Sequence, residues 1–187
     1  MKPPFSLTDA DLRRRVFWPL LGLTLLIIFV FNLTGAPLNT AAAPCGILSY
    51  ELAGSVSNAE AILASWDSIA RERAAFSLGL DFLFIPVYVS AITCGCGMAA
   101  GALRRRGWPL ASLDAAAGIA WGLFLAGLLD VVENIALSIV LFGIPTAPWP
   151  QVAYWCALPK FALVFFGIVY AFLGAAVHFS TVYLKRK

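Results

Sequence analysis

The stretch VFWPLLGLTLLIIFVFNLTG, residues 16–35, contains no charged residue and decides the fold class. An α-helix rises about 1.5 Å per residue, so about 20 apolar residues cross the roughly 30 Å hydrocarbon layer of a bilayer. Inside that layer the backbone must satisfy its own hydrogen bonds, which favours a helix. The stretch therefore predicts an uncleaved membrane-spanning helix. A cleaved signal peptide is the weaker alternative, because the small residues Ala41–Ala43 lie too far beyond the apolar run.

Three further segments have the same character, namely residues 77–100, 115–142 and 152–182. Of the 187 residues, 61% are hydrophobic and only 12% are charged, a balance far from that of soluble domains. The connections after the second and third segments are short, so neighbouring helices pair as antiparallel hairpins. We therefore expect an all-α membrane protein, a single integral domain over 1–187 that forms a four-transmembrane-helix up-down bundle.

The basic residues predict the orientation of this bundle. Ten of the thirteen lie before the first helix, between the second and third helices, or after the fourth. Lys and Arg accumulate on the cytoplasmic side of short loops, and four spans place all three groups on one face. We expect both termini in the cytoplasm, with a bacterial-type plasma membrane as the location. The net charge of +3 is then a topology signal and gives no indication of nucleic-acid binding. The three groups are Lys2 with Arg13–Arg15, Arg104–Arg106, and Lys185–Lys187.

Residues 36–75 form the long connection between the first two spans, outside the cytoplasm in this orientation. The spacing of Ser57 and Glu60 is that of a capping box, which predicts the start of a helix. Apolar residues then recur at helical spacing, so we expect an amphipathic helix over 57–73 that lies along the membrane or covers the bundle, with Trp66 at the headgroup level. An alternative is that this helix continues directly into the second span, because no proline intervenes.

Polar side chains converge on the third span, where Asp130, Glu133 and Asn134 occupy positions i, i+3 and i+4 of one helix face. A charge near the bilayer centre costs about 2.5–3.5 kcal/mol, so these groups should face the protein interior. Lys160 of the fourth span lies at the same depth as Glu133, counted inward at 1.5 Å per residue. The second span adds two polar residues, seven positions apart on one face. The candidate polar intramembrane site comprises Asp81, Tyr88, Asp130, Glu133, Asn134 and Lys160.

Two interpretations of this site remain open. Intramembrane ionisable groups mark proton, cation or polar-substrate sites, but an internally paired network can also simply fix helix register. A di-iron bundle needs Glu-x-x-His pairs, and the single histidine, His178, lies near the end of the fourth span. We therefore expect no metal and no cofactor. A hard cation held by oxygen atoms of the third span is a minor alternative.

The cysteines and glycines indicate packing more than chemistry. Cys94 and Cys96 are separated by one residue beside small neighbours, which favours close helix contact. Cys45 and Cys156 lie on the same side of the membrane, and in an oxidising compartment they are candidates for a disulfide.

A small-xxx-small pair on the third span, Gly118 and Gly122, predicts a contact either within the bundle or between copies in a homo-oligomer. Gly167 and Gly174 lie at seven-residue steps from Lys160 and predict tight packing of the fourth span.

No motif for a nucleophile, a metal or a phosphate is present. The leading prediction is a small polytopic binding or accessory protein, not an enzyme, whose polar intramembrane pocket holds a lipid-like ligand or a protein partner. One alternative is an intramembrane enzyme that uses the buried carboxylates as acid and base on a lipid substrate. Another is a proton- or ion-coupled transporter, which would need to oligomerise to build alternating access.

Overall fold

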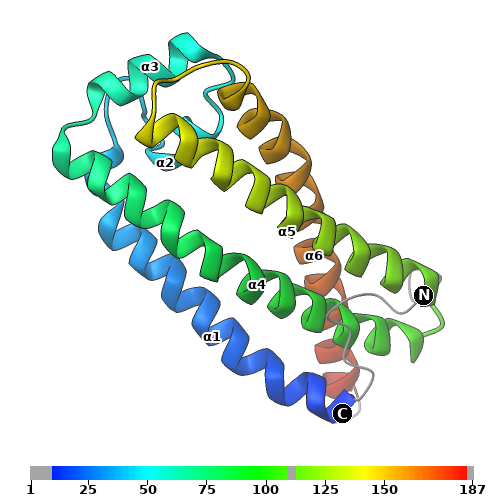
Figure 1. The fold of residues 1–187 in the computed structure, drawn as a ribbon. Coiled ribbons are helices and arrows are strands. Elements are labelled where there is room, and N and C mark those ends of the chain that lie inside the picture. The colour runs from blue at the N-terminus through cyan, green and yellow to red at the C-terminus, as the bar shows by residue number, and fades with distance from the viewer. Residues whose placement is uncertain (1–9, 109–112, 185–187) are drawn as a thin grey trace. The chain divides into compact units, whose positions relative to one another are not determined.

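The computed structural model describes residues 10–108 and 113–184, which are helical with short connections and no strand (Figure 1). Four helices are long and apolar enough to cross a membrane, as predicted. Lys2 and Lys185–Lys187 lie outside the described residues. The elements are α1 (Ala10–Thr34), the 3-10 helix η1 (Ala36–Leu38), α2 (Ile47–Glu51), α3 (Val56–Ser65), α4 (Ser68–Arg104), α5 (Leu113–Phe142) and α6 (Trp149–Leu184).

The four long helices extend beyond the apolar segments that predicted them. α1 begins at Ala10 instead of residue 16, and α4 begins at Ser68 instead of residue 77. The added turns carry Arg13–Arg15 and Arg71–Arg73. Arginine and glutamate are good helix formers, so the helix continues where the apolar stretch has already ended.

The helix predicted over 57–73 is confirmed near its beginning and wrong at its end, because the chain breaks after Ser65 and a second helix, α4, begins at Ser68. α3 is capped by Ser55, whose side chain accepts a hydrogen bond from the Asn58 amide, and it ends at Ser65. α4 has its own cap in Asp67, whose carboxylate accepts from the Ala70 amide at 2.8 Å. The break arises because the apolar pattern contains two N-cap residues, each of which starts a helix of its own. The alternative that the helix continues directly into the second span is therefore wrong as well.

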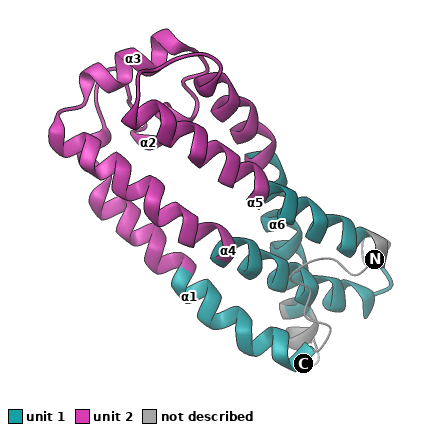
Figure 2. Ribbon diagram, viewed as in Figure 1, with its two compact units in different colours: residues 1–23, 87–126, 161–187 teal, residues 24–86, 127–160 magenta. Residues whose placement is uncertain are grey.

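The chain divides into two compact units, and each of the four long helices contributes one part of its length to each unit (Figure 2). Unit 1 contains residues 1–23, 87–126 and 161–187, and unit 2 contains residues 24–86 and 127–160. In α4 the division falls directly after Pro86 and in α6 one residue after Pro159, whereas in α1 and α5 it falls after Leu23 and Ala126 with no proline at the boundary. A proline inside a helix removes one backbone hydrogen bond and clashes with the preceding turn, so the two prolines are natural places for a helix to pass from one packed unit to another.

The core of unit 2 lies where the segment between α1 and α4 packs against the long helices. Trp66 is at its centre: only 3% of the residue is exposed, its indole nitrogen donates to the Leu38 carbonyl at 3.0 Å, and its ring lies 5.2 Å from that of Tyr50. Trp66 therefore packs inside the protein, and its depth relative to the lipid headgroups stays a prediction. The segment folds into a packed cap because it can bury many apolar side chains, which include Leu38, Tyr50, Ala59, Ile62, Leu63, Trp66, Leu137, Val140 and Ala153.

Small residues bring α4, α5 and α6 close together in unit 1. A Cβ atom at Gly174 would lie 2.1 Å from Cβ of Ala99, and one at Gly167 would lie 2.8 Å from Cδ2 of Leu123. The buried Cys96 thiol donates to the Gly167 carbonyl at 3.2 Å. The packing predicted for Gly167 and Gly174 is confirmed, and the Cys96 thiol serves the same contact.

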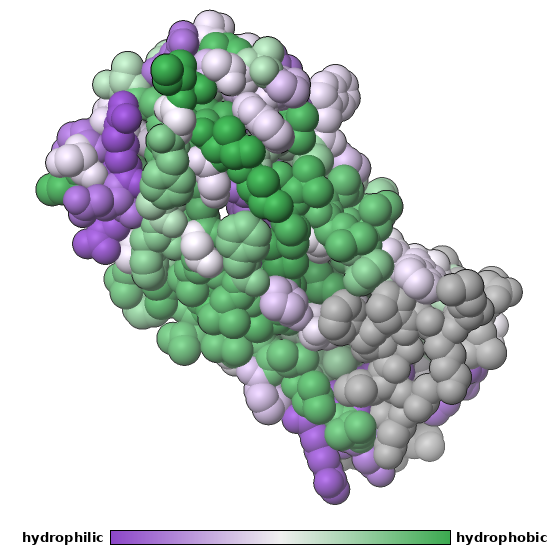
Figure 3. Space-filling model, viewed as in Figure 1, coloured by the Kyte–Doolittle hydropathy of each residue, from purple (hydrophilic) through white to green (hydrophobic). Residues whose placement is uncertain are grey.

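The outer faces of the long helices are strongly apolar. Trp18 on α1 is 61% exposed and Phe172 on α6 is 72% exposed. Figure 3 shows that apolar residues make up most of the coloured surface on this face, whereas hydrophilic residues gather over the beginning of α4 and over the beginning of α1. An aqueous solvent would make such exposed apolar helix faces unfavourable, whereas the hydrocarbon of a bilayer would not.

Candidate functional site

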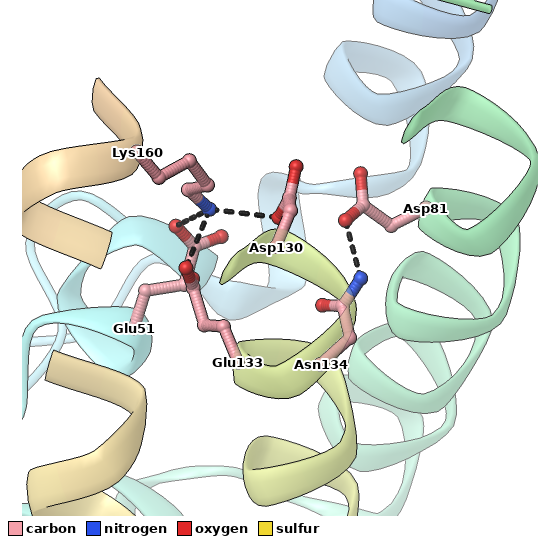
Figure 4. A network of polar contacts seen from close by, with 6 residues as sticks. All are labelled: Glu51, Asp81, Asp130, Glu133, Asn134 and Lys160. Carbon is pink, nitrogen blue, oxygen red and sulfur yellow. Dashed lines mark hydrogen bonds and ion pairs between the residues drawn. The ribbon is translucent and has the colours of Figure 1, made fainter. Parts of the chain in front are cut away.

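A single ammonium group holds three carboxyl groups together inside unit 2 (Figure 4). Lys160 Nζ lies 2.7 Å from Glu133 Oε2, 2.9 Å from Asp130 Oδ1 and 3.7 Å from Glu51 Oε2. The Lys160 side chain is 8% exposed and that of Glu133 only 1%. Lys160 belongs to α6, the two neighbouring acids to α5, and Glu51 to α2, so one cation ties three helices together.

A second polar contact extends this cluster toward α4. The Asn134 side-chain amide donates a hydrogen bond to Asp81 Oδ2. The Asn134 carbonyl in turn accepts from the Ser138 hydroxyl at 2.7 Å. Asp81 interacts electrostatically with Asp130, so the two contacts belong to one network.

Glu51 reaches the network because α2 is a short helix held firmly on α5. The neighbouring Tyr50 hydroxyl donates to the Leu137 carbonyl at 2.9 Å, and only 1% of Tyr50 is exposed. Gly46 and Gly54 flank α2 with φ angles of 58° and 67°, a left-handed region that glycine enters without strain. A Cβ at Gly54 would also meet the ring of Tyr154 at 3.4 Å. The two glycines thus turn the chain sharply enough to place Glu51 beside Lys160.

The charges of the cluster do not balance. Lys160 supplies one positive charge against the four carboxyl groups of Glu51, Asp81, Asp130 and Glu133. Taking several uncompensated charges out of water is very unfavourable, so buried carboxyl groups instead hold protons or bind a cation. Burial raises the pKa of Glu51 above its ordinary value; Lys160 opposes that rise and Asp130 adds to it. Glu51 is therefore a natural holder of one of these protons.

Glu133 has hydrogen-bonding capacity that its surroundings leave unused. Its residue exposure is 0%, and Oε2 makes the ion pair with Lys160. Oε1 is buried without a hydrogen-bond partner among the residues that the structure describes. A buried acceptor left unsatisfied costs about 1–3 kcal/mol, more when it is charged. The position calls for a hydrogen-bond donor, which can be a proton on a neighbouring carboxyl group, a water molecule or a ligand.

The structure brings together five of the six residues of the predicted site and adds one. Asp81, Asp130, Glu133, Asn134 and Lys160 lie in one network. Tyr88 is buried but belongs to unit 1, not to the unit that holds the network.

Glu51 was missed by the sequence reasoning. Its one available signal is that it is the sole charged residue between Gly35 and Glu60. Helical periodicity in the long spans gives no information about the depth of a residue in a connecting segment. The isolated charge of Glu51 therefore does not predict that this residue lies beside Lys160.

The predicted disulfide is not present in the structure. Cys45 is an exposed free thiol and Cys156 is a half-buried free thiol. Cys156 lies one helical turn before Lys160 and is near enough to Glu133 and Lys160 to interact with them electrostatically.

Within residues 10–108 and 113–184, no three carboxylate, thiol or imidazole side chains are grouped so that they could share a metal ion. The donors that a hard cation would need are instead turned toward Lys160. The position of a cation is thus taken by the ammonium group of the chain itself.

No protein-family model, curated protein or solved structure is significantly similar to this chain. The class of this protein is therefore inferred from its own sequence and structure. It is an all-helical protein with four helices long and apolar enough to cross a membrane, and it holds a buried network of four carboxyl groups, one amide and one ammonium group.

Proposed function

We propose that the chain is a multi-pass protein of a bacterial-type plasma membrane, an up-down bundle with both termini in the cytoplasm. The exposed apolar faces of α1 and α6 support insertion. Arg13–Arg15 and Arg104–Arg106 support the orientation, since basic residues collect on the cytoplasmic side. The exposed thiol of Cys45 then lies outside the cytoplasm.

Labelling of intact cells with a membrane-impermeant maleimide tests this orientation. Cys45 reacts in intact cells, and Cys45→Ser abolishes the signal because the other three thiols are buried or half-buried. Labelling that occurs only after the cells are opened would place this segment in the cytoplasm and contradict the proposal.

We propose that the protein binds a lipid-like ligand whose polar head donates hydrogen bonds, such as a hydroxyl-bearing or ammonium-bearing amphiphile. The observation that carries the proposal is the unsatisfied Oε1 of the fully buried Glu133, in a network with more carboxyl groups than its one cation balances. A donating head group satisfies that oxygen, and a positively charged one also offsets the excess negative charge. The apolar faces of the helices suit the hydrocarbon part of such a ligand.

A purely structural role explains the network less well. One Lys–Glu pair is enough to fix the register of two helices, yet three carboxyl groups from two helices converge on Lys160. Each added buried charge without its own partner lowers stability. A network with a purely structural role would therefore lose stability by having Glu51 and Asp130 in addition to Glu133. A site that binds protons or a hydrogen-bond donor is expected to have these additional carboxyl groups.

Mass spectrometry of organic extracts from the purified protein tests the proposal. The wild type should retain an amphiphile that Glu133→Gln loses, because the amide removes one acceptor and the charge. Glu60→Gln, which makes the same change at an exposed position on α3, should retain it. Equal retention by all three proteins, or no retained amphiphile in the wild type, would contradict the proposal.

Acid–base catalysis on a lipid is the second candidate, favoured by one observation. Glu51 and Glu133 both approach Lys160, and the two carboxyl groups act electrostatically on each other. Two such groups, one protonated and one ionised, are the acid and base that a proton-transfer site requires. Incubation of the retained amphiphile with the wild type decides between the candidates: a change in its mass or isomeric form indicates an enzyme, and an unchanged ligand indicates a binding protein.

A protein partner or a second copy has one available surface on α5. A Cβ at Gly122 would meet Leu163 at 3.2 Å, so this glycine packs inside the molecule, whereas a Cβ at the exposed Gly118 meets nothing within 4 Å. We propose Gly118 as the closest approach point for a neighbouring helix. Cross-linking in membranes should give a dimer that Gly118→Leu abolishes; an unchanged dimer would exclude this surface.

A further inference from the structure

Unit 1 contains a groove that takes no part in the buried network. Its volume is about 210 Å³. Apolar side chains from three helices line it, and several are open to the surroundings: Val169 is 37% exposed, Leu173 43% and Phe166 64%. The lining residues include Leu103 and Trp108 at the end of α4, Ile119 of α5, and Phe166, Val169 and Leu173 of α6.

Leu103 and Trp108 form one wall of this groove, at the point where a C-capping motif ends α4. The Trp108 amide donates to the Leu103 carbonyl at 3.3 Å and the Gly107 amide donates to the Arg104 carbonyl at 3.0 Å, with φ of 69° at Gly107. This is the Schellman pattern, in which glycine takes the left-handed position and the residue after it contacts the helix again. Trp108 is thereby folded back beside Leu103, and both face the groove.

The same turn carries three arginines. Arg104, Arg105 and Arg106 lie in the chain between the two wall residues Leu103 and Trp108, and all three are exposed. Arg104 is close enough to Tyr170, another lining residue, to act electrostatically on its hydroxyl. An apolar groove therefore opens next to concentrated positive charge.

We infer that this groove binds one anionic phospholipid of the surrounding membrane. An acyl chain lies along the apolar walls, and the phosphate group lies at the arginine-bearing turn. Charge complementarity selects this occupant, because basic clusters beside membrane helices attract anionic head groups, whereas a zwitterionic lipid gains much less. Arginine also suits phosphate, which it contacts through two parallel hydrogen bonds.

This inference depends on membrane insertion but not on the buried network. Glu133→Gln should therefore leave phospholipid binding unchanged even though it disrupts the ligand site of unit 2. Loss of the phospholipid in Glu133→Gln would contradict a separate groove site. Recovery of the protein in the soluble fraction without detergent would instead refute insertion itself.

Native mass spectrometry from mixed micelles with equal amounts of phosphatidylglycerol and phosphatidylcholine tests the site. The wild type should retain one phosphatidylglycerol in clear preference to phosphatidylcholine. Arg104→Gln and Arg105→Gln should each weaken that retention about five-fold, the effect of one basic residue near an anionic surface. Arg73→Gln, an exposed arginine of unit 2, is the matched control and should change nothing.

Val169→Trp fills the groove without changing charge and should also reduce phosphatidylglycerol retention. Circular dichroism and elution volume verify that each variant is folded, and the comparison of the two lipids on the wild type needs no variant at all. Equal retention of the two lipids would overturn the inference. An effect of Arg73→Gln as large as that of Arg104→Gln would overturn it too, as would full retention in Val169→Trp.

Discussion

Lys160 and Glu133 form an ion pair with Nζ and Oε2 2.7 Å apart, from which water is almost wholly excluded. Removing Lys160, the one cation that three carboxyl groups share, leaves buried negative charge uncompensated, a loss of about 3–5 kcal/mol. Lys160→Met should therefore lower the free energy of unfolding in detergent by that order. The double variant Lys160→Met/Glu133→Gln should recover part of the loss, because it also removes one charge. A Lys160→Met protein as stable as the wild type would show that the acids do not depend on this cation.

The contact between Asn134 and Asp81 joins α5 to α4. A hydrogen bond to a charged group contributes about 1.5–3 kcal/mol, so Asn134→Leu should lower the free energy of unfolding by that amount. Asp81→Asn should have a similar effect, and the double variant should be little worse than either single one. A double-mutant cycle measures this coupling. Strictly additive losses would mean that the two side chains act independently.

The raised pKa of Glu51 makes stability depend on pH. Burial raises this pKa above the ordinary value of 4.5, so the native state favours the protonated form. The contribution of Glu51 is fully present below about pH 4.5 and is lost as the pH rises through the pKa of the folded state. The difference in unfolding free energy between the wild type and Glu51→Gln should therefore fall as the pH rises above 4.5. A difference that grows with pH would mean that Glu51 is stabilised as a carboxylate.

The approach of α4 and α6 in unit 1 requires a glycine at position 174, where a Cβ would lie 2.1 Å from Cβ of Ala99. Gly174→Ala should destabilise the protein by about 1–3 kcal/mol, the usual effect of overpacking. Gly79→Ala, at an exposed helical position with nothing within 4 Å, is the control and should be neutral or slightly stabilising. Thermal unfolding in detergent gives both values, and equal shifts would contradict the close contact.

The sequence predicts the long helices well because their signal is local. Twenty apolar residues in a row have few alternatives to a helix, and the spacing of Asp130, Glu133 and Asn134 fixes their common face without any knowledge of the fold. The matching depths of Glu133 and Lys160 follow from the rise per residue alone. Five of the six network residues were accordingly named from the sequence, and the structure supplies their contacts.

The segment between α1 and α4 was predicted poorly because its structure depends on tertiary packing. Its helical spacing predicts an amphipathic helix that lies along the membrane or covers the bundle, and only the second agrees with an apolar face that is buried against α5 and α6. The complete burial of Trp66 does not follow from the spacing. Two caps, Ser55 and Asp67, divide what periodicity alone presents as one helix. The position of Glu51 depends on the Tyr50–Leu137 hydrogen bond and on two glycine turns, none of which can be derived from residue spacing.

The central claim is that the buried network binds a ligand and does not merely hold the helices together. The most direct test measures two quantities on Glu133→Gln: the unfolding temperature in detergent and the amount of amphiphile retained after purification. Glutamine keeps the shape of the side chain and removes one charge from a site with excess negative charge, so the fold should remain intact while retention is lost. A large fall in the unfolding temperature with retention unchanged would contradict the claim and leave the network as a structural brace.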